Sequence, residues 1–253
     1  MQITVQSIAV DEILPWRELY RQEMNCQIIH DSLHRRDGWT LPYSLAIDNE
    51  FAGYGSVVIA GPWKGKPTIF EWYVLPQFRF RTFDFFATLL STSQAIAIET
   101  QSNDAFLTVM LHTFAQDIKT ESILFHDQTT TTYTVPGAVF RPATADDSAA
   151  ISAQQLDCDS DWLLEVDATI AATGGILYHY NRPYGDIYMA VAEPFRQRGL
   201  GAYVVQELKR ICYEGGSVPA ARCNPKNLAS RKTLQRAGFS PCGCILHGLV
   251  AGL

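Results

Sequence analysis

The stretch FRQRGLGAYVVQELKR, residues 195–210, decides the fold of the C-terminal half of this chain. It follows DIYMAV, residues 186–191, whose imperfect alternation of apolar and polar residues is typical of a strand buried on both faces. After Arg196, Gly199 and Gly201, apolar residues recur at helical spacing, at Val204, Val205, Leu208, Ile211 and Cys212. The sequence here predicts a strand, a glycine-containing loop and an amphipathic helix.

A loop of this kind is suited to bind an anion. Glycine lets the backbone approach a ligand closely, and the first amides of a helix have no partner inside the helix. The helix dipole adds a partial positive charge at the same place, so a phosphate or pyrophosphate is the expected guest. The dinucleotide-binding fingerprint needs a third glycine where Val204 stands, and the pattern G-x-x-x-x-G-K-[ST] is absent from the sequence.

The remaining pattern, R-x-x-G-x-G from Arg196 to Gly201, resembles the acetyl-coenzyme A pyrophosphate loop of the GNAT superfamily of N-acetyltransferases. The segment from Asn224 to Phe239 resembles that family's following motif, and RPATADD at residues 141–147 resembles its usual opening. The resemblance covers about residues 135–253. It implies central strands that splay apart around the pantetheine arm, and acetyl-CoA as cosubstrate.

The resemblance also implies which residues contact the cofactor. Asn227 falls where the family's asparagine contacts the pantetheine arm, although it also fits the N-cap of a helix, and both roles can coexist. The other implied contacts are made mainly by the backbone, at Met189, Ala190, Val191, Arg196, Gln197, Arg198, Gly199, Leu200, Gly201 and Ala202.

An internal repeat extends this interpretation to the whole chain. YSLAIDNEFAGYGSVVI, residues 43–59, matches WLLEVDATIAATGGILY, residues 162–178, with a constant offset, so that Ile47 corresponds to Val166. Each segment predicts strand, tight turn and strand, with the turns at Asp48-Asn49 and Asp167-Ala168. EWYVLPQFRFR at 71–81 then matches YMAVAEPFRQR at 188–198 in the same order.

The repeat predicts an α/β (α+β) protein of two tandem GNAT-like units, residues 1–134 and 135–253. Each unit is expected to hold a mixed, mainly antiparallel sheet flanked by helices, with splayed central strands in the C-terminal one. The first copy has Thr82 and Asp84 where the second has Gly199 and Gly201. Because a carboxylate repels a pyrophosphate, we expect only the second copy to bind the cofactor.

The catalytic residues are harder to predict, because the family's usual acid and base are replaced. Leu234 stands where many relatives carry a tyrosine that protonates the thiolate, and Arg222 stands where some carry a glutamate base. Candidates on or near the central strands are Asp186 and Tyr188, with Glu165 and His179 as further possibilities. The sequence favours a turn role for Asp186, after Pro183-Tyr184-Gly185, over a catalytic one, and it favours a packed strand position for His179 over a base.

Net charge, hydropathy and cysteine spacing limit the partners that the protein is expected to bind. The formal net charge is −6, which argues against non-specific binding of nucleic acid or of an anionic membrane. No apolar run approaches the roughly 20 residues that span a bilayer, and the first residues lack a signal-peptide pattern, so a cytoplasmic protein is expected. None of the six cysteines is spaced C-x-x-C, so no metal is expected.

The sequence thus favours an N-acetyltransferase that moves an acetyl group from acetyl-CoA to an amine of a small molecule or peptide. A non-catalytic coenzyme A-binding sensor or structural protein is the alternative, and Leu234 and Arg222 favour it. A binding protein for another phosphate ligand is a third interpretation. The sequence leaves open whether the protein forms a homodimer.

Overall fold

The computed structural model describes residues 2–27 and 30–251. The chain divides into two compact units, Met1–Ser122 with Gly243–Leu253, and Ile123–Cys242. Two strands, β6 (Ala115–Asp127) and β12 (Phe239–Val250), have residues in both units. The boundary between residues 134 and 135 was predicted from the sequence repeat, and it stays a prediction. Within the described ranges, no helix is long and apolar enough to cross a membrane.

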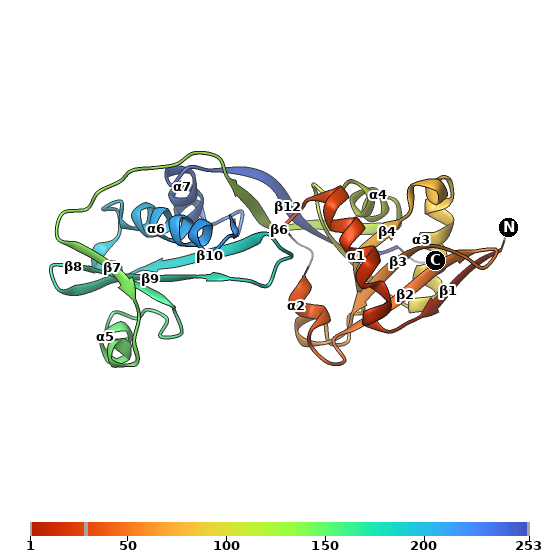
Figure 1. The fold of residues 1–253 in the computed structure, drawn as a ribbon, viewed down its shortest axis with the longest axis horizontal. Helices are drawn as coiled ribbons and strands as arrows, with labels where there is room; N and C mark the ends of the chain where they lie inside the picture. Colours follow the sequence, from red (N-terminus) through yellow and green to blue (C-terminus); the bar gives the residue numbers. More distant parts are fainter. Residues whose placement is uncertain (1, 28–29, 252–253) are drawn as a thin grey trace. The chain divides into compact units, whose positions relative to one another are not determined.

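The first unit has strand order β1-β2-β3-β4-β5-β12 (Figure 1). All neighbours are antiparallel except β4 and β5, which are parallel. The α3 and α4 helices cover a core built around Trp72, Phe85 and Phe86, whereas α1 packs Ile13 and Tyr20 onto a separate cluster. The elements are β1 (Ile3–Ser7), α1 (Val10–Met24), α2 (Asp31–His34), β2 (Thr40–Ile47), β3 (Glu50–Val58), β4 (Thr68–Val74), α3 (Thr82–Ser93), β5 (Ala97–Gln101) and α4 (Ala105–Phe114).

The second unit has strand order β6-β11-β10-β9-β8-β7, with β10 and β11 the parallel pair. In Figure 1, α6 and α7 lie on one face of this sheet and α5 on the other. The elements are β7 (Ala138–Pro142), α5 (Ser148–Ala153), β8 (Trp162–Val166), β9 (Thr169–Leu177), β10 (Tyr184–Val191), α6 (Leu200–Glu214), β11 (Val218–Cys223) and α7 (Leu228–Arg236). The predicted fold class, mixed and mainly antiparallel sheets flanked by helices, is confirmed.

Four short 3-10 helices complete the secondary structure of the described ranges, at Gly61–Trp63, Pro76–Arg81, Ala145–Asp147 and Glu193–Phe195. Two of them, Pro76–Arg81 and Glu193–Phe195, follow the corresponding strands β4 and β10.

The two predicted hairpins have the same local geometry. Both residues of each turn have positive φ, 48° and 69° at Asp48-Asn49 and 50° and 61° at Asp167-Ala168, as two-residue type I′ turns require. Each hairpin also carries a register shift at the corresponding place, after Leu45 in the first and after Leu164 in the second. A shared irregularity is harder to explain by chance than a shared strand, so the structure supports the repeat.

The central parallel strands separate after a short stretch of pairing. β10 pairs with β11 only from Tyr184 to Asp186, although β10 continues to Val191 and β11 to Cys223. In the first unit, β4 pairs with β5 only at Thr68 and Ile69. The predicted splay is present in the second unit, and the first unit has it as well.

Candidate active site

The open edge of β10 in the second unit faces the gap left by β11. The Val218 amide donates to the Pro183 carbonyl at 2.8 Å, so the backbone of odd-numbered residues points toward the β11 side. Met189 and Val191 therefore direct their amides and carbonyls into the gap. Ala190, also predicted to contact the cofactor, is opposite Thr173 and directs its backbone toward β9.

The loop that follows β10 forms a cradle of backbone amides. Gln197 and Gly199 have φ of 64° and 82°, and α6 begins directly after, at Leu200. Within the described part of the chain, the amides of residues 197–201 have no hydrogen-bond partner. Alternating left-handed residues before a helix N-terminus create a concavity suited to an anion, and the binding of the cofactor there stays a prediction. The Ala202 amide, in contrast, already donates to the Gly199 carbonyl at 3.1 Å.

The two glycines of the loop serve different purposes. A Cβ atom at Gly199 would meet nothing within 4 Å, so this residue is needed for its left-handed backbone and faces open space. A Cβ atom at Gly201 would lie 3.0 Å from Thr233 Cγ2 and 3.3 Å from Met189 Cε. Gly201 therefore allows α6 to pack closely against α7 and β10, and Leu200, 3 % exposed, anchors the helix start in the core.

Two arginines supply positive charge around the cradle. Arg196 Nε donates to the Val191 carbonyl at 3.2 Å, which ties the loop to the end of β10. The Arg198 guanidinium lies 5.4 Å from the centre of the Phe195 ring. Both side chains belong to exposed residues, so their charges are available to an anionic ligand.

Asn227 is the N-cap of α7, and its side-chain oxygen accepts from the Ser230 amide at 3.0 Å. The capping role considered from the sequence is thus present. The residue is exposed, and its side-chain nitrogen has no protein partner within the described residues. The capping geometry leaves that nitrogen available to a ligand.

The corresponding loop of the first unit has no such cradle. The 3-10 helix Pro76–Arg81 continues directly into α3, and no residue between 75 and 93 has a positive φ. The Thr82 amide donates to the Arg79 carbonyl, and Arg81 pairs with Asp84. These contacts support the expectation that the first copy does not bind the cofactor, which stays a prediction.

Asp186 lies at the point where β10 and β11 separate, and a histidine and an arginine side chain share one of its oxygens. His179 Nε2 is 3.1 Å and Arg222 Nε 3.3 Å from Asp186 Oδ2. Asp186 is 4 % exposed. The structure thus brings together three side chains from different segments: Asp186 on β10, His179 in the loop before it and Arg222 on β11.

Tyr188 lies on β10 two residues beyond Asp186. A Cβ atom at Gly175 would lie 2.6 Å from the Tyr188 hydroxyl oxygen and 2.9 Å from Asp161 Oδ2, so the phenol lies over that glycine, next to an acidic loop. Burial raises the pKa of Tyr188, so the phenol keeps its proton near neutral pH and is suited to donate a hydrogen bond rather than to act as a base.

Two other positions have structural roles. Leu234 is 4 % exposed and belongs to the core between α6 and α7. Glu165 pairs with Arg141, which also binds Asp147, so this carboxylate is engaged in an ion-pair cluster. No group of three or more residues suited to hold a metal ion occurs within residues 2–27 and 30–251.

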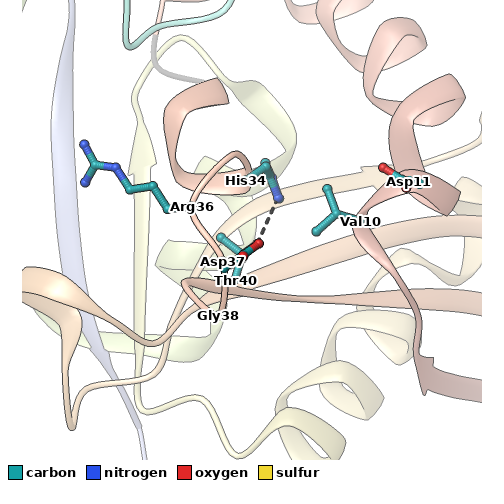
Figure 2. Close-up of a pocket in the computed structure, with 7 residues that line it drawn as sticks. All are labelled: Val10, Asp11, His34, Arg36, Asp37, Gly38 and Thr40. Atoms are coloured by element: carbon teal, nitrogen blue, oxygen red, sulfur yellow. Dashed lines mark hydrogen bonds between the residues drawn. The ribbon is translucent and has the colours of Figure 1, made fainter.

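The first unit contains a cavity of about 280 Å³ (Figure 2). His34 and Thr40 line it side by side, with a hydrogen bond between Nδ1 and Oγ1 at 3.1 Å, and the Arg36 side chain points away. His34 Nε2 contacts the fully buried Glu71 at 3.1 Å, and Glu71 also accepts two hydrogen bonds from Arg17. In the repeat, Glu71 corresponds to Tyr188. This polar network therefore lies on the sheet face that corresponds to the face carrying Asp186 and Tyr188 in the second unit. The remaining lining residues are Val10, Asp11, Asp37 and Gly38.

Comparison with known proteins finds one family model that matches part of the chain and several solved structures with a similar fold. Residues 126–239 match the model of the acetyltransferase (GNAT) family. An acetyltransferase of the GNAT family from Colwellia psychrerythraea superposes with a TM-score of 0.73 at 14 % identity, covering 98 % of this chain and 100 % of that one. No curated protein sequence matches the chain.

Two further solved structures are similar over nearly the full chain. A tandem GNAT protein from the clavulanic acid biosynthesis pathway has a TM-score of 0.65 at 12 % identity and full coverage of both chains, 100 % and 100 %. A GCN5-related N-acetyltransferase from Sphaerobacter thermophilus has a TM-score of 0.60 at 14 % identity, covering 99 % and 97 %. These likenesses show the fold, and the family match contains the strand, cradle and helix described above. Residues 126–239 therefore match the acetyltransferase (GNAT) family, and the chain as a whole has the fold of solved GNAT proteins.

Proposed function

We propose that the second unit binds acetyl-CoA and transfers its acetyl group to an amine. The observation that carries the proposal is the set of unpartnered amides at residues 197–201, at the end of a strand whose edge is open. The amides, the helix dipole and the guanidinium groups of Arg196 and Arg198 together suit a pyrophosphate.

The open edge of β10 offers the pantetheine arm a hydrogen-bonding path. Met189 and Val191 present their backbone groups to it, as an edge strand does to an added strand. The thioester end of an arm lying along β10 reaches the region of Ile187 and Asp186. The Met189 amide, the first on the open edge beyond the paired stretch, is suited to polarise the thioester carbonyl.

The chemistry needs a neutral amine and a nearby proton acceptor. The amine nitrogen attacks the carbonyl carbon, the C–N bond forms, the C–S bond breaks, and the thiolate takes up a proton. Asp186 and Tyr188 flank the position of the thioester, and the Tyr188 phenol, which keeps its proton, is suited to the donor role. We propose as acceptor a small-molecule or peptide amine, to which the acidic net charge of −6 is suited.

A non-catalytic coenzyme A-binding protein is the second candidate. Leu234 favours it, because a buried leucine has no proton to give to a leaving thiolate. The two functions share the cradle and differ only in turnover, so binding and turnover must be measured separately.

The experiment is calorimetric titration with acetyl-CoA of the unchanged protein, Gly199→Asn and Gly199→Asp. Asn and Asp both tolerate left-handed φ, and a side chain at Gly199 meets open space, so the two variants differ mainly in charge. We expect Gly199→Asp to bind at least tenfold more weakly than Gly199→Asn. Equal affinities, or no binding to the unchanged protein, overturn the proposed site. Release of free thiol in the presence of amines then separates the enzyme from the sensor.

A further inference from the structure

We propose that His179 is the general base of the transfer reaction, with Asp186 and Arg222 as its positioning residues. The inference rests on the proposed function and deepens it, because it assigns the step for which the family's usual residues are missing. Nothing in the linear spacing of these three residues indicates it.

The geometry places the three side chains around one atom. Asp186 Oδ2 is 3.1 Å from His179 Nε2 and 3.3 Å from Arg222 Nε. The exposed fraction of the side chain is 21 % for His179, 34 % for Arg222 and 6 % for Asp186. The carboxylate is thus buried beneath the imidazole and the guanidinium group, and the imidazole is partly open to a small molecule.

The location matches the reacting end of the cofactor. Asp186 is the last residue of β10 that pairs with β11, so it marks the apex of the splay. Val191, where β10 meets the cradle, lies about 16 Å of extended strand away. An arm that begins at the cradle and follows β10 therefore brings its thioester toward Asp186 and His179.

The charges give each residue a different task. Arg222 is a permanent cation, and its contact with Asp186 Oδ2 fixes the position of that carboxylate. That carboxylate then stabilises the imidazolium that forms when His179 takes a proton, as in other carboxylate–histidine pairs. Histidine titrates in the neutral range in its ordinary state, which suits a general base.

The proton balance is complete. The acceptor's ammonium group gives one proton to His179, which passes it to solvent. The neutral amine attacks the thioester carbonyl, and as the C–S bond breaks the leaving sulfur takes a proton from the Tyr188 phenol, which regains one from the nitrogen. The products are the amide and free coenzyme A, and no further reactant is needed.

The other groups facing this cluster do not compete for the proton. The Tyr180 ring lies 4.4 Å from the His179 ring, centre to centre, and the Arg222 guanidinium lies 5.7 Å from the Tyr180 ring centre. Burial, and then the charge of Asp186, raise the pKa of Tyr180 well above its ordinary value, so it stays neutral. Cys242 is a further titratable group near Tyr180 and adds to the rise of its pKa.

The test compares His179→Gln and His179→Ala with His112→Gln, which changes an exposed histidine on α4. Acetyl-CoA affinity is measured by calorimetry. Turnover is measured as thiol release from acetyl-CoA, both with a panel of primary amines and with water as the only acceptor. The second assay requires no knowledge of the natural acceptor.

We expect His179→Gln to lower the rate at least about 100-fold while the affinity stays within about twofold, and added imidazole to restore part of the rate of His179→Ala. His112→Gln keeps the full rate. Asp186→Asn should move the acidic limb of the pH profile of kcat/KM to lower pH by about one unit, a change that a merely structural role would not produce.

A His179→Gln protein that binds acetyl-CoA normally and turns over at the full rate overturns this inference and leaves the proposed function standing. If the unchanged protein binds acetyl-CoA but releases no thiol with either acceptor, the inference is overturned in favour of the sensor. If the unchanged protein does not bind acetyl-CoA, the proposed function fails first.

Discussion

Arg196 Nε donates a hydrogen bond to the carbonyl oxygen of Val191, 3.2 Å away, across the bend between β10 and its loop. The first unit contains the same bond, from Arg79 Nε to the Val74 carbonyl at 2.9 Å. In both units an arginine of the loop therefore holds the loop against the end of the central strand. The bond was kept in the first unit, where the amide cradle is absent.

The equivalent arginines Arg196 and Arg79 are expected to differ in their effect on acetyl-CoA binding. Arg196→Ala should weaken acetyl-CoA binding about tenfold, because it removes a cation next to the cradle and frees the loop. Arg79→Ala is the matched control and should leave the affinity unchanged. Titration calorimetry on both variants decides the matter, and equal losses of affinity would contradict the assignment of the cofactor to the second unit.

The turn at Asp167-Ala168 is strained, since Ala168 has φ of 61°. Ala168→Asn should raise the free energy of unfolding by about 1 kcal/mol, because asparagine tolerates the left-handed region better than alanine. The converse change, Asn49→Ala in the first hairpin, should lower it by a similar amount. Thermal unfolding measures both, and shifts of the same sign would show that turn strain is not the cause.

Asp104 caps α4 by accepting from the Leu107 amide at 3.0 Å, and the Tyr20 hydroxyl also donates to it. Burial raises the pKa of Asp104 from its usual 3.8 to about 6. The folded state therefore holds this proton more tightly than the unfolded state, so the contribution of Asp104 to stability falls as pH rises from about 4 to 6.

Asp104→Asn should remove this dependence while retaining a capping oxygen. We expect the stability of the variant relative to the unchanged protein to increase by about 2 kcal/mol between pH 4 and pH 7. Denaturant unfolding at several pH values measures the difference in the free energy of unfolding between the two proteins. The other titrating groups contribute equally to both, so their effects cancel. A difference that stays constant with pH would contradict the raised pKa.

Glu71 and Arg17 form a fully buried ion pair, with Arg17 Nη2 2.8 Å from Glu71 Oε1. The nearby Arg17 and His34 hold the pKa of Glu71 below its usual range despite burial, so Glu71 is charged. Arg17→Leu should therefore cost about 3–5 kcal/mol, since it leaves a buried charge without its main partner.

The double variant Arg17→Leu, Glu71→Leu should be more stable than Arg17→Leu alone, because it removes that charge as well. Urea unfolding of the unchanged protein, Arg17→Leu, Glu71→Leu and the double variant measures the coupling. A double variant that loses the sum of the two single effects would show that the pair is not coupled.

The two hairpin turns and the amide cradle could be predicted from local sequence. The turns at Asp48-Asn49 and Asp167-Ala168 depend on φ preferences of a few residues, and the cradle at Gly199 depends on a glycine before an amphipathic run. The repeat was visible because both copies must place apolar residues on the same strand faces. Such features require only neighbours along the chain.

Other features arise only when distant segments meet. The C-terminal strand β12 places Ile245 to Leu249 beside β5 of the first unit, so residues 243–253 belong to a unit that the linear repeat assigns elsewhere. Strand pairing has no local sequence code, since any strand edge offers the same amides and carbonyls. The burial of its side chains decides which edge it joins.

The cluster of His179, Asp186 and Arg222 has the same origin. Each residue is unremarkable in its own segment, since Asp186 follows a turn, His179 lies among tyrosines and Arg222 replaces a family carboxylate. They meet because a loop, β10 and β11 converge where the parallel pairing ends. The anion cradle could be predicted from the sequence because backbone conformation forms it, whereas the charge cluster required the fold because side chains from three segments form it.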